Sequence, residues 1–158
     1  MAAINPVVLS TPSPAGLALQ QILAADSVTW KKGEFLYLSS GTVTPVSTTT
    51  GSDATELFIA AEDQDTSTSS TTVWVRRLER GTRLKMYATN NGTAATLADA
   101  NVGVNYEVYT ASNITYIDVN ATSTPTMVVE RLGTDVEPEK APTTAPEWAI
   151  VRFDPVLS

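Results

Sequence analysis

Short apolar runs separated by turn residues dominate the chain from residue 28 onward. The runs with strand character cover residues 35–38, 42–44, 57–61, 72–78, 84–89, 104–109, 114–119, 127–132 and 148–153. Short strands that follow one another at spacings of roughly 8–12 residues are typical of an antiparallel sandwich or barrel. The pattern therefore predicts an all-β fold, with one antiparallel β-barrel or sandwich-like domain over residues 27–158.

Turn signals stand between several of these runs. Ser39-Ser40-Gly41, Asn90-Asn91-Gly92 and Ala111-Ser112-Asn113 each separate two strand-like segments. Asn and Gly tolerate the positive φ angles that tight hairpin turns require. The sequence therefore predicts three hairpins at these positions.

The first 26 residues have a different character and are predicted to form an N-terminal arm. Pro6, Pro12 and Pro14 remove backbone donors, which favours an extended segment over the interior of a sheet. Ser13-Pro14 is typical of a helix start, and apolar residues follow it up to Leu23. We therefore expect a short helix over residues 14–25, which would need a packing partner because so short a helix is marginal alone.

Residues 133–147 interrupt the strand pattern. They combine three prolines with acidic residues, namely Asp135, Glu137, Pro138, Glu139, Pro142 and Pro146. Proline disrupts strand pairing and the charges favour solvation, so we predict an extended, Pro-rich acidic loop.

Composition narrows the chemistry that the chain can perform. It has 158 residues, no cysteine and no histidine, so a disulfide framework, a thiolate nucleophile, a Ser-His-Asp triad and an imidazole metal ligand are all excluded. Glu62, Asp63 and Asp65 are the one candidate group for acid/base catalysis. The same segment faintly resembles an EF-hand calcium loop, but Thr68 and Trp74 stand at the positions where such a loop needs Gly and Glu. We interpret this group as the start of a solvated loop and expect no enzyme activity, metal or cofactor.

Charge argues against a nucleic-acid partner. The formal net charge of −7 opposes binding to phosphate backbones, and no apolar run is long enough for a membrane helix. Half of the ten cations nevertheless lie between residues 76 and 85. This segment is either a polar strand face with its turn, or a positive stripe that docks on an acidic protein surface through Arg76, Arg80 and Arg83.

Apolar and aromatic residues outside the predicted core positions are candidates for contacts with other proteins. In the arm, candidate contacts to a larger partner are Ile4, Val7, Val8, Leu9, Leu17 and Leu19. The tryptophans Trp30, Trp74 and Trp148 could line a sugar groove, but core or interface packing is the more common role. They are our candidates for contacts between copies of the chain.

The order of these segments resembles the capsid decoration (cement) proteins of tailed bacteriophages. The resemblance lies in Trp30–Leu36, Gly41–Val43, Leu57–Ala61, Val102–Val108, Tyr116–Val119 and Val128–Leu132. It implies a β-barrel-like virion protein with an extended arm, made in the bacterial cytoplasm and carried on the outside of the capsid. Copies would cluster, as trimers or dimers, and clamp neighbouring major capsid subunits.

A second function class remains open from the sequence. Thr- and Ser-rich β domains with exposed tryptophans also occur in phage tail, fibre and surface adhesin proteins that bind a glycan or receptor. The two classes differ in partner: a decoration protein should bind assembled capsids and be nearly inert to glycans.

Overall fold

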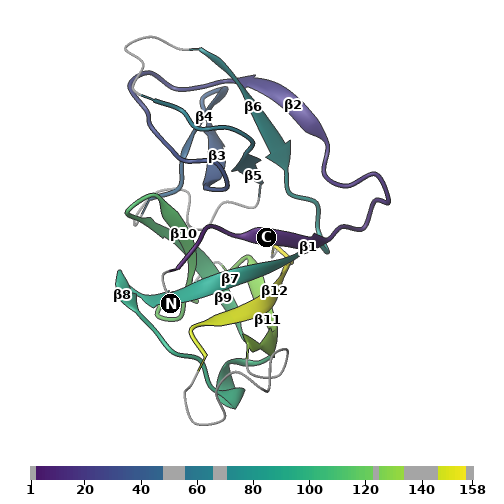
Figure 1. The fold of residues 1–158 in the computed structure, drawn as a ribbon, viewed down its shortest axis with the longest axis vertical. Coiled ribbons are helices and arrows are strands. Elements are labelled where there is room, and N and C mark those ends of the chain that lie inside the picture. Colours follow the sequence, from purple (N-terminus) through teal and green to yellow (C-terminus); the bar gives the residue numbers. More distant parts are fainter. Residues whose placement is uncertain (1–2, 48–55, 66–70, 123–124, 134–145, 156–158) are drawn as a thin grey trace.

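The computed structural model describes residues 3–47, 56–65, 71–122, 125–133 and 146–155, and its regular structure is almost entirely β (Figure 1). The strands are β1 (Val7–Ser10), β2 (Leu19–Leu23), β3 (Phe35–Ser39), β4 (Thr42–Pro45), β5 (Leu57–Ala60), β6 (Thr72–Arg77), β7 (Arg83–Asn90), β8 (Thr93–Ala94), β9 (Asn105–Ala111), β10 (Ile114–Asp118), β11 (Met127–Leu132) and β12 (Trp148–Phe153). A single 3-10 turn, η1, covers Asp99–Asn101 within the described residues.

Five strands close into a barrel, in the order β7-β10-β9-β11-β12, because β12 pairs again with β7. The long strand β7 also carries β1 along its first half and β8 at its far end. This confirms the predicted all-β, barrel-like fold. One pairing departs from the antiparallel expectation: β10 runs parallel to β7, with Ile117 beside Ala88.

The remaining strands form a second, antiparallel sheet in the order β2-β6-β5-β3-β4. Its two outer strands approach each other at one end, where Ala24 forms a bridge with Val43. The amide of Ala25 donates to the carbonyl of Val43 at 3.0 Å. The sheet is therefore curled around its own interior instead of lying flat.

Strand alternation divides the apolar residues between two cores. The first core fills the closed barrel and extends to the second sheet through Phe35, Leu57 and Ile59. The second core lies inside the curled sheet and consists of Ala24, Trp30, Leu36, Val43, Phe58, Ala60, Val73 and Val75. Strands β3 and β5 are thus covered on both faces, whereas β2 and β6 contribute only one face to a core.

The three predicted hairpin turns are confirmed. Both residues of each turn have positive φ: 51° and 83° at Ser40-Gly41, 50° and 98° at Asn91-Gly92, and 51° and 63° at Ser112-Asn113. Such two-residue turns match the right-handed twist of the strands that they join.

The predicted helix over residues 14–25 is wrong, because residues 19–23 form strand β2. Gly16, with φ of 81°, donates its amide to the carbonyl of Ser13 at 3.0 Å, so Ser13-Pro14 begins a tight turn. Ile22 and Ala24 then point to the second core while Leu19 and Leu23 point outward. That alternation has the period of a strand, and pairing with β6 gives this short segment the partner that an isolated helix lacked.

The N-terminal arm forms strands of both sheets, whereas the acidic loop is described only at its ends. Strands β1 and β2 belong to the barrel sheet and to the curled sheet respectively, so the arm is joined to both. Of the acidic loop, residues 134–145 lie outside the described residues. Its last residues run beside β7 and the segment that precedes η1: the carbonyl of Glu147 accepts from the amide of Ala88 at 2.9 Å, and that of Pro146 accepts from the amide of Leu97 at 2.8 Å.

The side chain of Asn5 links the arm to both sheets. Its Oδ1 accepts from the amide of Thr115 at 3.0 Å, and its Nδ2 donates to the carbonyls of Asn113 and Lys32 at 3.0 and 3.3 Å. A Cβ on Gly33 would lie 2.9 Å from the Cβ of Asn5, so a glycine is needed to let the arm approach so closely. Asn5 therefore sets the position from which β1 begins.

Replacing Asn5 should loosen this junction. We expect Asn5→Ala to lower the free energy of unfolding by about 1–3 kcal/mol, because the buried amide of Thr115 loses its acceptor. Urea denaturation measures the change. Asn5→Asp keeps an acceptor for Thr115 but turns a carboxylate oxygen toward the carbonyls of Asn113 and Lys32, so at pH 7 it should cost at least as much as Asn5→Ala. A loss for Asn5→Asp that is clearly smaller than that for Asn5→Ala would contradict the role of the two bonds that Asn5 donates.

Candidate interaction surface

Among the residues that the structure describes, exposed apolar side chains are concentrated in the first part of the chain. The large hydrophobic residues exposed in the described ranges are Ile4, Val7, Val8, Leu9, Leu19, Leu23, Leu38, Trp74 and Val102. Six of these nine lie between residues 4 and 23. Single exposed apolar residues are ordinary, but several of them on one short strand mark a candidate interaction site. The candidate functional surfaces of this protein are therefore β1 and the outer side of β2.

The first part of this surface is strand β1. All four of its residues are exposed, and Val7, Val8 and Leu9 are apolar. Among the described strands it pairs only with β7, with Val7 beside Lys85 and Val8 beside Leu84 (Figure 1). The other edge of β1 carries backbone groups that have no strand partner, which makes it a template for an added strand.

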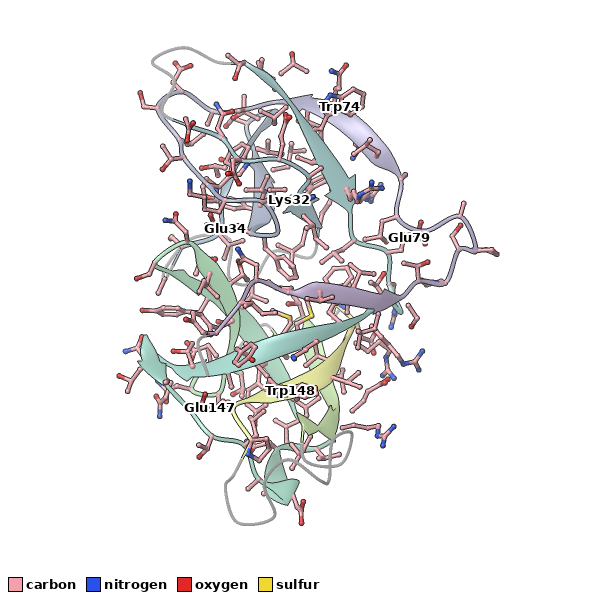
Figure 2. All side chains as sticks on the ribbon, in the orientation of Figure 1. Lys32, Glu34, Trp74, Glu79, Glu147 and Trp148 are labelled. Carbon is pink, nitrogen blue, oxygen red and sulfur yellow. The ribbon has the colours of Figure 1, made fainter. Side chains whose placement is uncertain are left out.

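The second part is the outer face of β2 and β6, which we call the β2–β6 face. Cross-strand pairs place Leu19 beside Arg76, Gln21 beside Trp74, and Leu23 beside Thr72. Their inward neighbours Val73 and Val75 are buried in the second core. Trp74 is 41% exposed and projects from β6 at the end of the molecule that holds the curled sheet (Figure 2).

Five of the arm residues proposed as partner contacts are exposed: Ile4, Val7, Val8, Leu9 and Leu19. Leu17 is not available, because it is buried in the barrel core. Its proposed role as a contact is therefore corrected. The turn at Gly16 directs the chain inward before β2 begins. The sequence analysis did not predict this turn, because it assigned residues 14–25 to a helix.

The three tryptophans have three different environments. Trp30 is 1% exposed in the second core and donates its Nε1 to the carbonyl of Glu62 at 3.0 Å, so it is not available for contacts between copies. Trp148 is half-buried, its ring lies against Gly133, and the Nζ of Lys85 sits 4.2 Å from the ring centroid. Only Trp74 presents its ring to an outside partner.

The positive stripe is largely neutralised by carboxylates from distant segments. Glu130 bonds Arg83 at 2.7 Å and Arg152 at 2.5 Å, and Asp154 lies 2.7 Å from Arg80 and 3.6 Å from Arg152. These five side chains form a ladder of alternating charge. Glu130 and Asp154 lie more than 45 positions from the stripe in the sequence, so the sequence could not show that they neutralise it.

Arg76 differs from the ladder residues. Its side chain is exposed, and its Nη1 donates to the backbone carbonyl of Leu17 at 2.9 Å. This bond ties the start of β2 to β6. Of the three stripe residues proposed as partner contacts, Arg76 belongs to the β2–β6 face, whereas Arg80 and Arg83 belong to the ladder.

Two members of the acidic group, Glu62 and Asp63, accept hydrogen bonds from backbone amides. Glu62 accepts from the amide of Trp74 at 3.1 Å, and Asp63 accepts from the amide of Lys32 at 2.7 Å. Across the described ranges, no group of three or more Asp, Glu, His or Cys side chains could hold a metal ion. Glu62 and Asp63 thus satisfy backbone donors, one in strand β6 and one in the loop before β3.

Glu34 is a buried carboxyl that the sequence analysis missed. It is 2% exposed, and its Oε2 accepts from the amide of Lys31. Burial raises the pKa of Glu34, and the nearby Asp63 adds to the rise, although the Lys31 amide and charge act in the opposite direction. Nothing in the local pattern marks it, because Glu34 stands between a turn glycine and a strand, where an exposed charge is usual.

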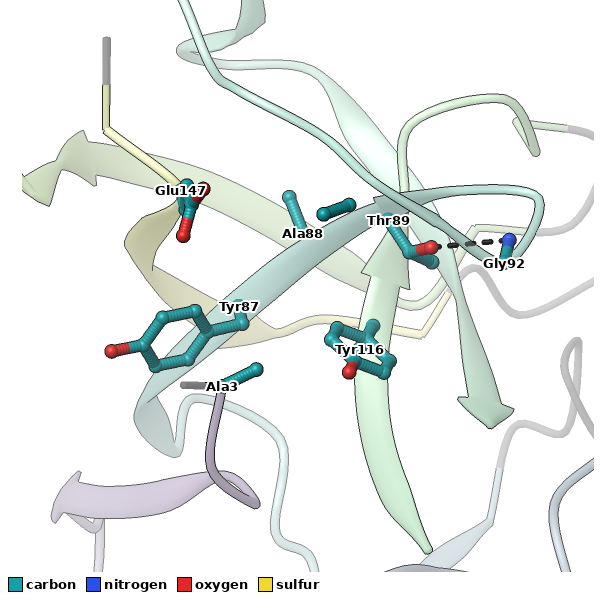
Figure 3. A pocket seen from close by; sticks show the side chains of 8 residues that line it. Ala3, Tyr87, Ala88, Thr89, Gly92, Tyr116 and Glu147 are labelled. Carbon is teal, nitrogen blue, oxygen red and sulfur yellow. Dashed lines mark hydrogen bonds between the residues drawn. The ribbon is translucent and has the colours of Figure 1, made fainter. Parts of the chain in front are cut away.

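A pocket of about 240 Å³ lies on the barrel beside the start of the N-terminal segment (Figure 3). Tyr87 and Tyr116 line it from β7 and β10, together with Ala3 and Glu147, and Tyr87 is only 3% exposed. Aromatic rings beside a carboxylate can stack on and hydrogen-bond a small ring-shaped ligand. The side chain of Thr89 is occupied internally, since it accepts from Gly92 at 3.1 Å and donates to Thr93 at 3.0 Å.

Comparisons with protein-family models, with curated proteins and with solved structures gave no match to this chain. Within the described residues, no helix is long and apolar enough to cross a membrane. The functional argument therefore depends on the geometry of the chain itself.

Removing the central carboxylate of the ladder should lower stability in a pH-dependent way. Burial alone would raise the pKa of Glu130, but the hydrogen bonds and charges of Arg83 and Arg152 outweigh it and lower the pKa. The stability from ionised Glu130 is therefore present above its unfolded pKa of about 4.5 and is lost as pH falls through the lower folded pKa. We expect Glu130→Gln to cost about 1–2 kcal/mol at pH 7 in urea denaturation, and the difference from wild type to shrink below pH 4.5.

Replacing Glu34 should change the stability with the opposite pH dependence. Its folded pKa is raised, so its contribution is most favourable below the unfolded value of 4.5 and is lost as pH rises through the folded pKa. Glu34→Gln should therefore be more stable than wild type at pH 7 to 8, with the gain vanishing near pH 4. Melting temperatures across this pH range provide the test. A variant less stable than wild type at pH 8 would contradict the assignment.

Proposed function

We propose that this chain is a capsid decoration protein that binds the outside of an assembled phage head and clamps neighbouring major capsid subunits. The observation that carries the proposal is the concentration of exposed apolar residues on β1 and β2, each of which is the end strand of its sheet in the described part of the chain. The resemblance of the strand order to decoration proteins supports the choice of partner. The role is one of binding, in which no covalent bond is made or broken.

The mode of attachment follows from the chemistry of an open strand edge. An extended segment of a capsid subunit can add to β1, so that backbone hydrogen bonds give affinity and Val7, Val8 or Leu9 lose contact with water. Attachment through several copies multiplies the effective concentration of each weak contact. A ligand that binds only the assembled shell stabilises that state by mass action.

Apolar contact, more than charge, is expected to supply the affinity. β1 reads Val-Val-Leu-Ser and carries no charge, although the whole chain has a net charge of −7. Arg80 and Arg83 already bond carboxylates of the same chain, so using them for a partner would require breaking the ladder. The net negative charge keeps free copies apart in solution.

A charged side chain on β1 should weaken attachment to heads. We expect Leu9→Glu to lower the affinity for undecorated, expanded heads at least tenfold, because a carboxylate would be buried without a partner. Co-sedimentation of the purified chain with heads of the phage that encodes it measures binding. Val102→Glu adds the same charge at an exposed apolar residue outside the N-terminal strands and is the control. Equal binding of Leu9→Glu and wild type would contradict a role for β1.

The pocket favours a second candidate function, glycan binding by an adhesin-type domain. The half-buried ring of Tyr116 provides an aromatic surface for a sugar ring, and Glu147 provides a hydrogen-bond acceptor. A panel of host-surface glycans separates the two functions. Glycan binding that Tyr116→Ala abolishes, without attachment to heads, would favour the adhesin.

A further inference from the structure

Aromatic side chains from four adjacent strands form a row across the outer face of the barrel. Strand pairing places Trp148 of β12 beside Tyr87 of β7, and Tyr116 of β10 beside Tyr109 of β9. The parallel pairing of β10 with β7 puts Tyr116 next to Tyr87, one position before the pair Ile117 and Ala88. The residues that alternate with these four on their strands lie in the barrel core, so the four rings are directed outward.

Two of the four rings offer surface to a ligand. Tyr87 is 3% exposed and Tyr109 is 8% exposed, whereas Trp148 and Tyr116 are half-buried. Trp148 already holds a cation of the same chain, because the Nζ of Lys85 lies 4.2 Å from its ring centroid. The attraction of an ammonium group to the face of an aromatic ring accounts for that contact. The second half-buried ring of the row, Tyr116, borders the pocket of about 240 Å³.

The pocket beside Tyr116 has a negative lining. Of the eight described residues that line it, only Glu147 carries a charge, and the others are tyrosines, alanines, a threonine and a glycine. Glu147 comes from the residue before β12 and Tyr116 from β10, so the carboxylate and the ring border the pocket from different elements (Figure 3). A carboxylate and an aromatic face both attract an ammonium group.

We infer that this pocket is a binding site for an ammonium group, which lies between the ring of Tyr116 and the carboxylate of Glu147. The ligand is a small organic amine, either a free molecule or an amino sugar. Its size follows from the pocket of about 240 Å³, which is smaller than the roughly 300–1,000 Å³ of pockets for drug-sized ligands. The inference deepens the second candidate function and rests on it where the ammonium group belongs to a glycan.

Charge favours a cation over an anion at this site. The chain has a net charge of −7, which raises the concentration of cations near its surface. An anion would meet the carboxylate of Glu147, whereas an ammonium group gains both the carboxylate and the ring. Lys85 lies 5.7 Å from the ring centroid of Tyr87, but it does not belong to the residues that line the pocket.

Choline and its uncharged isostere, 3,3-dimethylbutan-1-ol, test the requirement for a positive charge. We expect choline chloride to bind with a dissociation constant on the order of 1–10 mM, and the isostere to bind at least about tenfold more weakly. Amide chemical shifts of Ala88, Gly92 and Ala94, followed by NMR at constant ionic strength, measure the binding at the pocket. Glucosamine compared with glucose tests the amino-sugar source in the same way.

Variants of the two contacting residues test the geometry. Glu147→Gln and Tyr116→Ala should each weaken choline binding about fivefold, because each removes one of the two attractive groups. Tyr116→Phe keeps the ring and should bind choline like wild type. Glu79→Gln is the matched control for charge, because it removes a carboxylate in the turn before β7, at the opposite end of that strand from the pocket.

Equal binding of choline and its isostere would overturn the inference, as would an absence of shift changes at about 50 mM choline. Choline binding that both Glu147→Gln and Tyr116→Ala leave unchanged would also overturn it. The outcome is separate from that of the second candidate function. Binding of neutral glycans without any preference for an ammonium group would remove the inference and keep the adhesin, whereas choline binding without host-glycan binding would do the reverse.

Discussion

The three hydrogen bonds of Asn5 determine how the N-terminal segment meets the rest of the molecule. They tie residue 5 to the β9–β10 hairpin on the barrel side and to the loop before β3 on the side of the curled sheet. From this point the chain runs first along the barrel as β1 and then along the curled sheet as β2. One segment therefore supplies the edge strand of both sheets, and both edges depend on where Asn5 holds it.

Strand pairing and apolar burial hold the interior together, whereas the N-terminal segment supplies most of the exposed apolar side chains among the described residues. The closure of β7 on β12 leaves the barrel without a free edge along that seam. The arginine–carboxylate ladder joins Arg80 and Arg83 to Glu130, Arg152 and Asp154 beside the same seam. Arg77 lies 3.5 Å from Glu56, so three of the five cations between residues 76 and 85 face carboxylates of the same chain. What remains available to a partner is apolar and lies on β1, β2 and β6. This division supports attachment by strand edges over attachment by charge.

Local signals in the sequence predicted the strands from residue 35 onward and the three hairpin turns, because alternation and Asn or Gly at turns act over a few residues. The same local signals misassigned residues 19–23, where Ser13-Pro14 imitates a helix start and pairing with β6 decides the outcome. The arm was expected to be extended, and β1 is extended, but its pairing with β7 depends on residues that lie 73 to 78 positions away.

Long-range partners also explain what the sequence could not show about the candidate site. Trp30 and Leu17 were candidate contacts until the fold placed them in the two cores. The neutralisation of the stripe depends on Glu130 and Asp154, and the burial of Glu34 depends on loops that meet only in the folded chain. Ile4, Val7, Val8, Leu9 and Leu19 are exposed, so they remain candidates for contacts to a partner.

The most direct measurement of the central claim is a cryo-electron microscopy reconstruction of phage heads that carry this chain. The account predicts density for the chain on the outer surface of the head, with Val7–Ser10 or the β2–β6 face against a major capsid subunit or a second copy. Heads without such density would contradict the account. So would an attachment made through the tyrosine pocket while both N-terminal strands remain in solvent.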